Sequence, residues 1–214
     1  MSRIVLASAS PRRRELLSRF PIEFEVRPVD IDEDPGIGHD PQIVARRLAR
    51  LKAEAARLID ETSPILAADT IVWFEGRSIG KPGDADEAWA MLQMLRGKIH
   101  EVVTAVAFMP EGRRSAIIRH PVTRVRLRDF SDAEIESTIA RGEPFDKAGG
   151  YAIQDEVLRP IEAYSGCYCN VVGLPLWETL SVLRKGGVRV EGGRFLPECR
   201  ECPYVQDVNA TFVT

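Results

Sequence analysis

The alternation of apolar and polar positions predicts a series of short strands and helices. Its clearest stretch is residues 41–59, where Val44, Leu48, Leu51 and Ala55 recur at three- and four-residue spacing, as on the buried face of an amphipathic helix. Further helices are expected at residues 11–20, 84–97, 131–142 and 175–185, and strands at residues 3–7, 24–29, 64–74, 78–80, 102–109 and 122–128. Strands and helices mix without strict βαβ alternation, which favours an α/β protein with a mixed sheet.

Helix starts and irregular stretches are also visible in the sequence. Asp84 with Glu87, and Ser131 with Glu134, have the spacing of a capping box. Residues 143–173 are rich in glycine and have little periodicity, and residues 165–176 are interpreted as a loop that leads into a strand and a helix. The chain after the last helix is expected to be irregular.

The amino-acid composition argues against several classes of protein. The chain has 214 residues, of which 44% are hydrophobic, and this fits one large domain or two small lobes. With 29 basic and 32 acidic residues and a net charge of −3, it lacks the basic excess of a nucleic-acid-binding protein. No run approaches the roughly 20 apolar residues of a membrane span, and no signal-peptide apolar region follows the N-terminus. We therefore expect a cytoplasmic protein with neither nucleic-acid nor membrane partners.

Basic residues open the first expected helix, where acidic residues are usual. Residues 8–14 read SASPRRR, with Ser10 as a helix cap and Pro11 suited to the first turn. A helix N-terminus has unpaired N–H groups and a partial positive charge, so Arg12 and Arg13 make sense there if an anion completes the site. Hydroxyls, N–H groups and guanidinium groups together would bind a polyphosphate. The alternative is a solvated basic helix start.

A carboxylate, Asp69, lies in the middle of an apolar strand, where burial without a partner is costly. If the chain turns back at residues 75–77, Lys81 lies opposite Thr70 or Ile71 and close to Asp69. The carboxylate could then activate water or hold Mg²⁺, and the lysine could bind phosphate. The alternative is a buried structural ion pair.

Two further signals are weaker. Lys52 stands beside the apolar stripe of the longest expected helix, among alanines that would let another element approach, so its ammonium could point into a cleft. The acidic loop before that helix could supply a metal ligand from Asp30, Asp32, Glu33 or Asp34. A helix lysine is more often solvated and most acidic loops are only hydrated, so both alternatives stay open.

Residues 142–154, GEPFDKAGGYAIQ, combine glycines with polar side chains. Gly149 and Gly150 permit close approach of the backbone, while Lys147 brings a cation and Gln154 an amide that both donates and accepts. Such an amide can bind the edge of a nucleobase. The alternative is a turn with a capped helix end.

The cysteines form two close pairs, Cys167-x-Cys169 and Cys199-x-x-Cys202. Four cysteines in a chain of this length do not suggest a disulfide scaffold. Four thiolates could in principle bind zinc, but the second pair lies in an irregular tail and no histidine is nearby, so the sequence does not favour a structural metal. The three histidines are scattered and suggest neither a triad nor a histidine-based metal site.

Four segments resemble, in this order, the signature segments of the Maf family of nucleoside triphosphate pyrophosphatases: LASASPRRRELL, AADTIV followed by GKP, GEPFDKAGGYAIQ and NVVGLPL. The resemblance runs from about Ile4 to Leu183. ADT together with KAGxYxIQ is similar to the bacterial branch that acts on dTTP and UTP. The resemblance implies hydrolysis between the α- and β-phosphates, which gives a nucleoside monophosphate and pyrophosphate.

The resemblance also implies a fold and cofactors. It implies a mixed, curved central sheet flanked by helices, with two lobes and a cleft between them, in one domain over residues 1–190. The tail, residues 191–214, inherits no role. A divalent cation, Mg²⁺ or Mn²⁺, is implied as the cofactor, a nucleotide as the partner, and a homodimer as the assembly.

Residue roles follow from the resemblance position by position. Asp69 is implied as the proton acceptor for the attacking water and, together with Glu33, as a metal ligand. The implied substrate-binding residues are Ser8, Arg12, Arg13, Lys52, Thr70, Lys81, Lys147 and Gln154. Among these, Arg12, Thr70 and Gln154 match positions associated with base selectivity.

Two other functions stay open at this point. The family is also linked with septum formation, so a non-catalytic, nucleotide-binding regulator of cell division is one alternative. A phosphatase that releases inorganic phosphate would use similar residues and is another. The presence of Asp69, Lys81 and Glu33 together favours catalysis, because binding alone would not need a general base.

Overall fold

The structure is a computed structural model that describes residues 3–32 and 40–205. Within these ranges the strands form one open sheet, in the order β2-β1-β3-β5-β7-β8, with β4 added to β3 and β6 to β5. The strands are β1 (Ile4–Leu6), β2 (Phe24–Val26), β3 (Ile65–Phe74), β4 (Arg77–Ile79), β5 (Ile99–Met109), β6 (Ile117–Arg119), β7 (Val122–Leu127) and β8 (Ile161–Ser165). β1 pairs in parallel with β2 and β3, and the other pairs are antiparallel, so the expected mixed sheet is confirmed.

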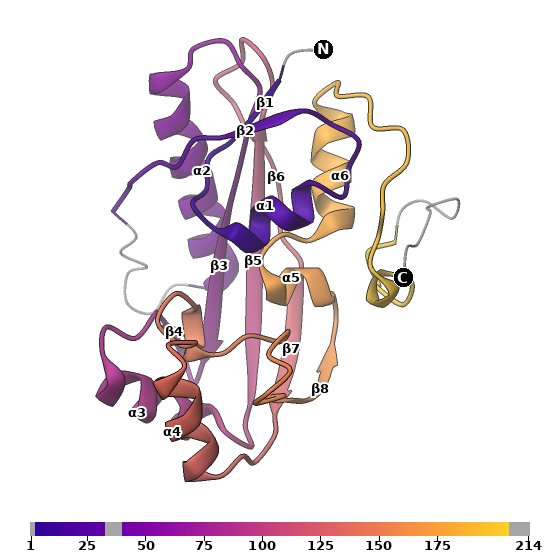
Figure 1. Ribbon diagram of the computed structural model, residues 1–214. Helices are drawn as coiled ribbons and strands as arrows, with labels where there is room; N and C mark the ends of the chain where they lie inside the picture. Colours follow the sequence, from indigo (N-terminus) through magenta and orange to yellow (C-terminus); the bar gives the residue numbers. More distant parts are fainter. Residues whose placement is uncertain (1–2, 33–39, 206–214) are drawn as a thin grey trace.

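Helices cover both faces of this sheet (Figure 1). They are α1 (Pro11–Leu17), α2 (Pro41–Ile59), α3 (Ala85–Leu95), α4 (Asp132–Ala140), α5 (Tyr168–Val172) and α6 (Leu176–Lys185), with the short turns η1 (Ala148–Gly150) and η2 (Pro197–Cys199). α2 packs on one face of β3 and β5, α1, α5 and α6 pack on the opposite face, and α3 and α4 lie together at one end. None of the described helices is long and apolar enough to cross a membrane.

Side-chain alternation along β3 decides which residues reach each layer. Ile65 and Ala67 pack in the cluster with α2, whereas Leu66 and Ala68 pack in the cluster with α1, α5 and α6. Asp69 has the same parity as Ile65 and Ala67. The strand therefore directs its one carboxylate toward α2.

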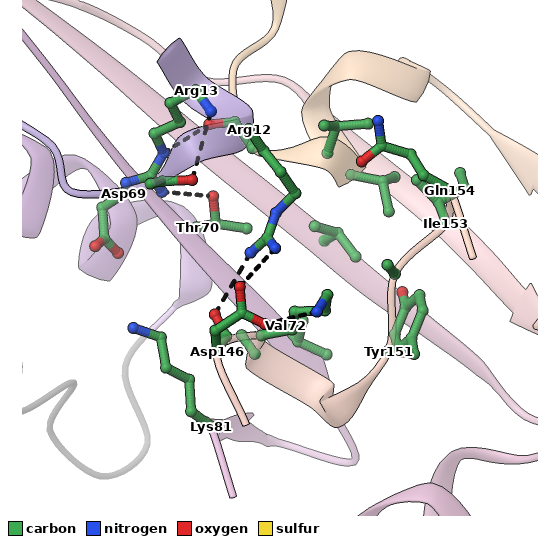
Figure 2. A pocket seen from close by; sticks show the side chains of 18 of the residues that line it. Arg12, Arg13, Asp69, Thr70, Val72, Lys81, Asp146, Tyr151, Ile153 and Gln154 are labelled. Atoms are coloured by element: carbon green, nitrogen blue, oxygen red, sulfur yellow. Dashed lines mark hydrogen bonds and ion pairs between the residues drawn. The ribbon is translucent and has the colours of Figure 1, made fainter. Parts of the chain in front are cut away.

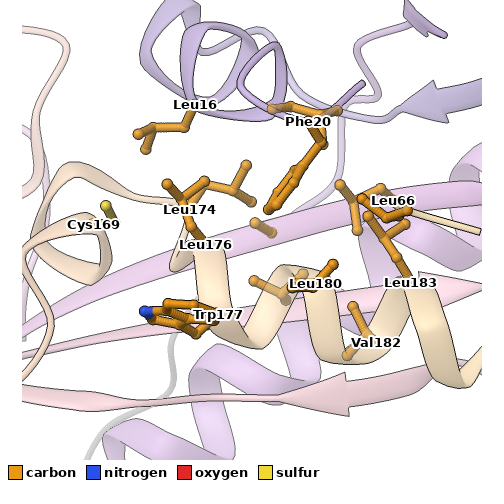
Figure 3. Packing of buried hydrophobic residues seen from close by; sticks show 14 of the residues in the cluster. Leu16, Phe20, Leu66, Cys169, Leu174, Leu176, Trp177, Leu180, Val182 and Leu183 are labelled. Carbon is orange, nitrogen blue, oxygen red and sulfur yellow. The ribbon is translucent and has the colours of Figure 1, made fainter. Parts of the chain in front are cut away.

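The layer on the other face is built around α6, whose Leu180 and Leu183 lie near Phe20 and Leu66 (Figure 3). Trp177 stacks on Phe195 with the ring centroids 4.0 Å apart, and Phe20 meets Phe195 edge-on at 5.8 Å. Burial of a phenylalanine contributes about 1.5–3 kcal/mol. Phe195 belongs to the irregular segment after α6, so this part of the expected tail lies in the hydrophobic core.

Most of the expected elements are confirmed, with changes at their ends. The helix at 41–59 has the predicted bounds, and the predicted capping box of α4 is complete. The box at α3 is only half formed, because Asp84 accepts from the Glu87 N–H while the Glu87 carboxylate accepts from the Gly83 N–H. β2 is shorter than expected, and β5 begins three residues earlier, at Ile99.

The prediction for residues 165–176 is wrong. The structure describes all of these residues, and β8 ends at Ser165, after which the chain forms α5 and then α6 without another strand. A short apolar run such as NVV fits a strand or a helix equally well. The helix forms because Asn170 Nδ2 donates to Val102 O and Thr123 Oγ1, both at 2.8 Å, and so holds α5 against β5 and β7.

Candidate active site

A cleft opens where α1, β3, α5 and the segment around η1 meet (Figure 2). It encloses about 800 Å³, part of which is open to solvent, and it continues into a hollow that shares Arg13, Lys52 and Lys81 with it. The predicted site residues that line the two together are Ser8, Arg12, Arg13, Lys52, Asp69, Thr70, Lys81, Lys147 and Gln154. Glu33 lies outside the described residues.

The cleft contains a buried ion pair between Asp69 of β3 and Lys52 of α2. Lys52 Nζ lies 2.7 Å from Asp69 Oδ1, and the two residues are 8% and 5% exposed. α2 can lie close to β3 because Ala49, Ala53 and Ala56 beside Lys52 are small and buried. Asp69 Oδ2 bonds to no other described residue, which makes it the oxygen available to a water or a metal ion.

Lys81 reaches the same cleft from the β3–β4 hairpin. Ile79 pairs with Val72, so the chain returns toward Thr70 as the sequence predicts. Lys81 stays exposed, and the ion pair with Asp69 belongs to Lys52. A buried ion pair at Asp69 is therefore present, but its cation is Lys52 and not Lys81, the lysine that the sequence suggested.

The hairpin is tied to the glycine-rich segment by its backbone. Gly149 N donates to Gly80 O at 2.9 Å. Gly149 has φ +77°, and a Cβ there would lie 3.3 Å from Val72 and Tyr151 side chains, so glycine is required at this position. This contact places the loop that carries Lys81 beside the segment that carries Lys147.

Arg13 joins three elements around the cleft. Its Nε donates to Gly173 O at 2.9 Å, one terminal nitrogen to Ser8 Oγ at 3.2 Å, and the other to Thr70 Oγ1 at 3.0 Å. These acceptors belong to the β1–α1 loop, β3 and the end of α5. Arg13 thus brings a positive charge into the cleft and fixes the position of its walls.

Behind Thr70 lies a buried hydrogen-bond network that the sequence did not predict. Thr70 Oγ1 and Thr104 Oγ1 are 2.9 Å apart. Thr104 N donates to Asn170 Oδ1, and Thr104 Oγ1 donates to Asn170 O, both at 2.7 Å. The network connects β3, β5 and α5 and holds the hydroxyl to which Arg13 donates.

A second ionic cluster lies across the cleft from Asp69, as Figure 2 shows. Arg12 reaches from α1 to the Asp146 carboxylate at 2.7 Å, and Lys147 Nζ lies 2.6 Å from the other Asp146 oxygen and 3.2 Å from Glu143. Burial alone would raise the pKa of Asp146, but hydrogen bonds from Lys147 and Arg12 outweigh it and lower that pKa. Sequence reasoning missed Asp146, whose only signal was an acidic residue directly before Lys147.

The opposite end of the cleft is neutral. Tyr151, Ile153 and Gln154 lie there, away from the charged groups (Figure 2). The Tyr151 hydroxyl lies 2.6 Å from His100 Nε2, and burial lowers the pKa of His100 to about 4, so this imidazole is uncharged at neutral pH. The cleft can therefore accommodate a molecule with a polyanionic part and an uncharged ring.

The chain resembles known proteins over most of its length. It matches the family described as Maf-like protein over residues 3–186. It is 52% identical over 204 residues to the dTTP/UTP pyrophosphatase of Thermomicrobium roseum, which covers 94% of this chain and 93% of that protein. It is 48% and 47% identical to the dTTP/UTP pyrophosphatases of Citrifermentans bemidjiense and Geobacter sp. strain M21, each over 86% of this chain and 95% of the relative. The chain therefore belongs to the Maf-like protein family.

Proposed function

We propose that the protein hydrolyses nucleoside triphosphates, with dTTP and UTP preferred, to the nucleoside monophosphate and pyrophosphate. The position of Asp69 carries this proposal, because one oriented carboxylate lies in a cleft with cations at one end and neutral side chains at the other. Phosphoryl-transfer enzymes act chiefly by positioning and by charge stabilisation, and a general base must lie near the reacting phosphorus. The names of the relatives support the choice of substrate.

Each residue of the cleft has its own role in the proposed hydrolysis. Asp69 Oδ2 accepts the proton of the water that attacks the α-phosphorus, while the bond from Lys52 to Oδ1 fixes the carboxylate. Arg13 and Lys81 stabilise the negative charge of the phosphates. The Ser8 and Ser10 hydroxyls and the N-terminus of α1 complete the phosphate-binding surface.

A divalent cation, Mg²⁺ or Mn²⁺, is proposed as the cofactor of this reaction. Mg²⁺ in such sites is commonly bound by one or two carboxylates, with water and substrate phosphates as its other ligands. Asp69 would supply one carboxylate and Glu33 is proposed as the second. When bound, the ion would neutralise phosphate charge.

The neutral end of the cleft is proposed to bind the base. Uracil and thymine present both donors and acceptors at their edges, and the Gln154 amide can pair with either. Val72, Val102 and Tyr151 supply apolar surface beside it. Lys147 and Arg12, which are bound to Asp146 in this structure, would contact the phosphates or the base once that pairing opens.

The experiment is an assay of the purified protein with Mg²⁺ and dTTP, UTP, CTP, GTP and 7-methyl-GTP, with identification of the products. We expect dTMP or UMP together with pyrophosphate, formed faster than the products of the other nucleotides. Orthophosphate together with a diphosphate would overturn the proposal. Tight nucleotide binding without turnover would favour the non-catalytic regulator instead.

We propose a cytoplasmic location, a homodimeric assembly and a single domain over residues 1–190, all on the strength of the family resemblance. Cell fractionation tests the location, and light scattering on the purified protein tests the assembly. Limited proteolysis followed by mass spectrometry tests the domain boundary.

A further inference from the structure

All four cysteines of the chain meet in one buried cluster. Cys167 caps α5 and Cys169 lies in its first turn, while Cys199 ends η2 and Cys202 follows it. None of the four is more than 4% exposed. The C-terminal segment, yellow in Figure 1, descends from α6 to the level of α5, and this path brings the two pairs together.

The sulfur atoms are in mutual contact. Cys169 Sγ lies 3.4 Å from Cys199 Sγ. The Cys167 side chain is hydrogen-bonded to the side chains of both Cys169 and Cys202. The contacts therefore run through all four thiols. Two isolated disulfide-forming pairs would not need the contact between Cys167 and Cys169.

Backbone amides surround this cluster as they surround thiolate ligands. The N–H groups of Asn170 and Cys169 lie close to the Cys167 sulfur, and that of Tyr204 lies close to the Cys202 sulfur. Donors of this kind orient metal-ligating groups and stabilise their negative charge. A cysteine that only fills apolar space behaves as a small hydrophobic residue and needs no such donors.

We propose that Cys167, Cys169, Cys199 and Cys202 bind one zinc ion as a structural site. Zinc in structural sites is tetrahedral and is commonly held by four cysteines. Cys199-x-x-Cys202 has the usual spacing of a ligand pair, and Cys167-x-Cys169 is one residue shorter. Zn–S bonds of about 2.3 Å place tetrahedral sulfurs roughly 3.8 Å apart. No group of three or more His, Cys, Asp or Glu side chains among the described residues is arranged to hold a metal ion as it stands, so the thiols must turn toward a common centre on binding.

This site would be distinct from the catalytic cation site but joined to it through α5. Asn170, in the middle of this short helix, holds Thr104, and Gly173, at its C-terminal end, accepts a hydrogen bond from Arg13. On the other side, Cys199 O accepts a hydrogen bond from Trp177 Nε1 at 3.2 Å. Zinc would therefore tie the tail to the core and fix the wall of the cleft without touching the substrate.

The test begins with the unaltered protein, purified in reducing buffer without chelator and analysed by elemental mass spectrometry. We expect one zinc per chain. Protein refolded with Co²⁺ in place of zinc should show the visible absorption bands of tetrahedral tetrathiolate Co²⁺, a readout that depends on no variant.

Variants then assign the site. Cys199→Ser combined with Cys202→Ser should lose nearly all zinc and lower the melting temperature, whereas Val190→Ala, which trims a buried side chain of the same segment, should keep its zinc. A chelator should lower the melting temperature of the unaltered protein but not that of the cysteine variant.

Four free thiols without zinc uptake, or a mass that shows disulfides after purification under reducing conditions, would overturn the proposal. Because zinc content is measured without nucleotide, either result is independent of the proposed hydrolysis.

Discussion

Lys52 Nζ donates to Asp69 Oδ1 across 2.7 Å, and this bond leaves Oδ2 as the carboxylate oxygen that bonds to no other described residue. Both side chains are nearly withdrawn from solvent. Removal of one partner from a buried ion pair is costly, because the other charge stays uncompensated. The pair therefore fixes the carboxylate in a single orientation, and this is what a general base requires.

Asp69→Asn is expected to remove turnover while nucleotide binding is retained. The amide keeps the shape of the side chain and an oxygen for Lys52, but it cannot take a proton. General base catalysis contributes typically 10²–10⁴-fold, so kcat should fall by about that factor. The measurement is pyrophosphate release under saturating nucleotide, alongside nucleotide affinity by calorimetry.

Asp129→Asn is the matched control for this variant. It makes the same chemical change at an exposed position outside the cleft and should leave kcat unchanged. An Asp69→Asn protein that is folded and fully active would rule out Asp69 as the base.

Asp146→Asn is expected to lower KM for the nucleotide with little change in kcat. Asp146 pairs with both Arg12 and Lys147, so a triphosphate must compete with this carboxylate for the two cations. Such partly exposed pairs are worth roughly 0–1 kcal/mol, so KM should fall by up to about fivefold. Steady-state kinetics at low ionic strength measure the KM of the variant and of the unaltered protein. A higher KM in the variant would show that Asp146 helps to bind substrate.

Local patterns predicted much of the fold and part of the site. The apolar spacing of α2 and the small residues around Lys52 gave a lysine in a cleft as one of two alternatives, because both are properties of one helix. The pairing of Arg12 with Asp146, the contact of Thr104 with Asn170 and the meeting of the two cysteine pairs all join distant segments. Those contacts depend on how α1, α5 and the tail pack, and no local spacing encodes them.

Thr104→Val is expected to lower both stability and catalysis. The change removes a buried hydroxyl that joins Thr70 to Asn170, and leaving such partners unsatisfied costs about 1–3 kcal/mol. Because Thr70 in turn accepts from Arg13, kcat/KM should fall as well. Urea unfolding measures the first effect and steady-state kinetics the second.

Thr179→Val separates the two effects. Thr179 is also buried, and its hydroxyl donates to Pro175 O at 2.8 Å within α6, which does not line the cleft. Its loss should cost similar stability and leave kcat/KM unchanged. If both variants lost activity equally, the network behind Thr70 would have no specific role in the site.

The protein is expected to lose stability between about pH 6.5 and pH 4 because of His100. Burial lowers the pKa of His100 from 6.5 to about 4, and its Nδ1 is buried without a hydrogen-bond partner among the described residues. Across this interval the unfolded chain binds the proton and the folded chain does not, so acid favours unfolding. Between pH 7 and pH 5 the loss should be about 2 kcal/mol in the free energy of unfolding, from 1.36 kcal/mol per pKa unit.

Urea unfolding at the two pH values should show this loss in the unaltered protein and in His120→Gln, which changes a partly exposed histidine, but much less of it in His100→Gln. An equal pH dependence in His100→Gln would assign the effect to other groups.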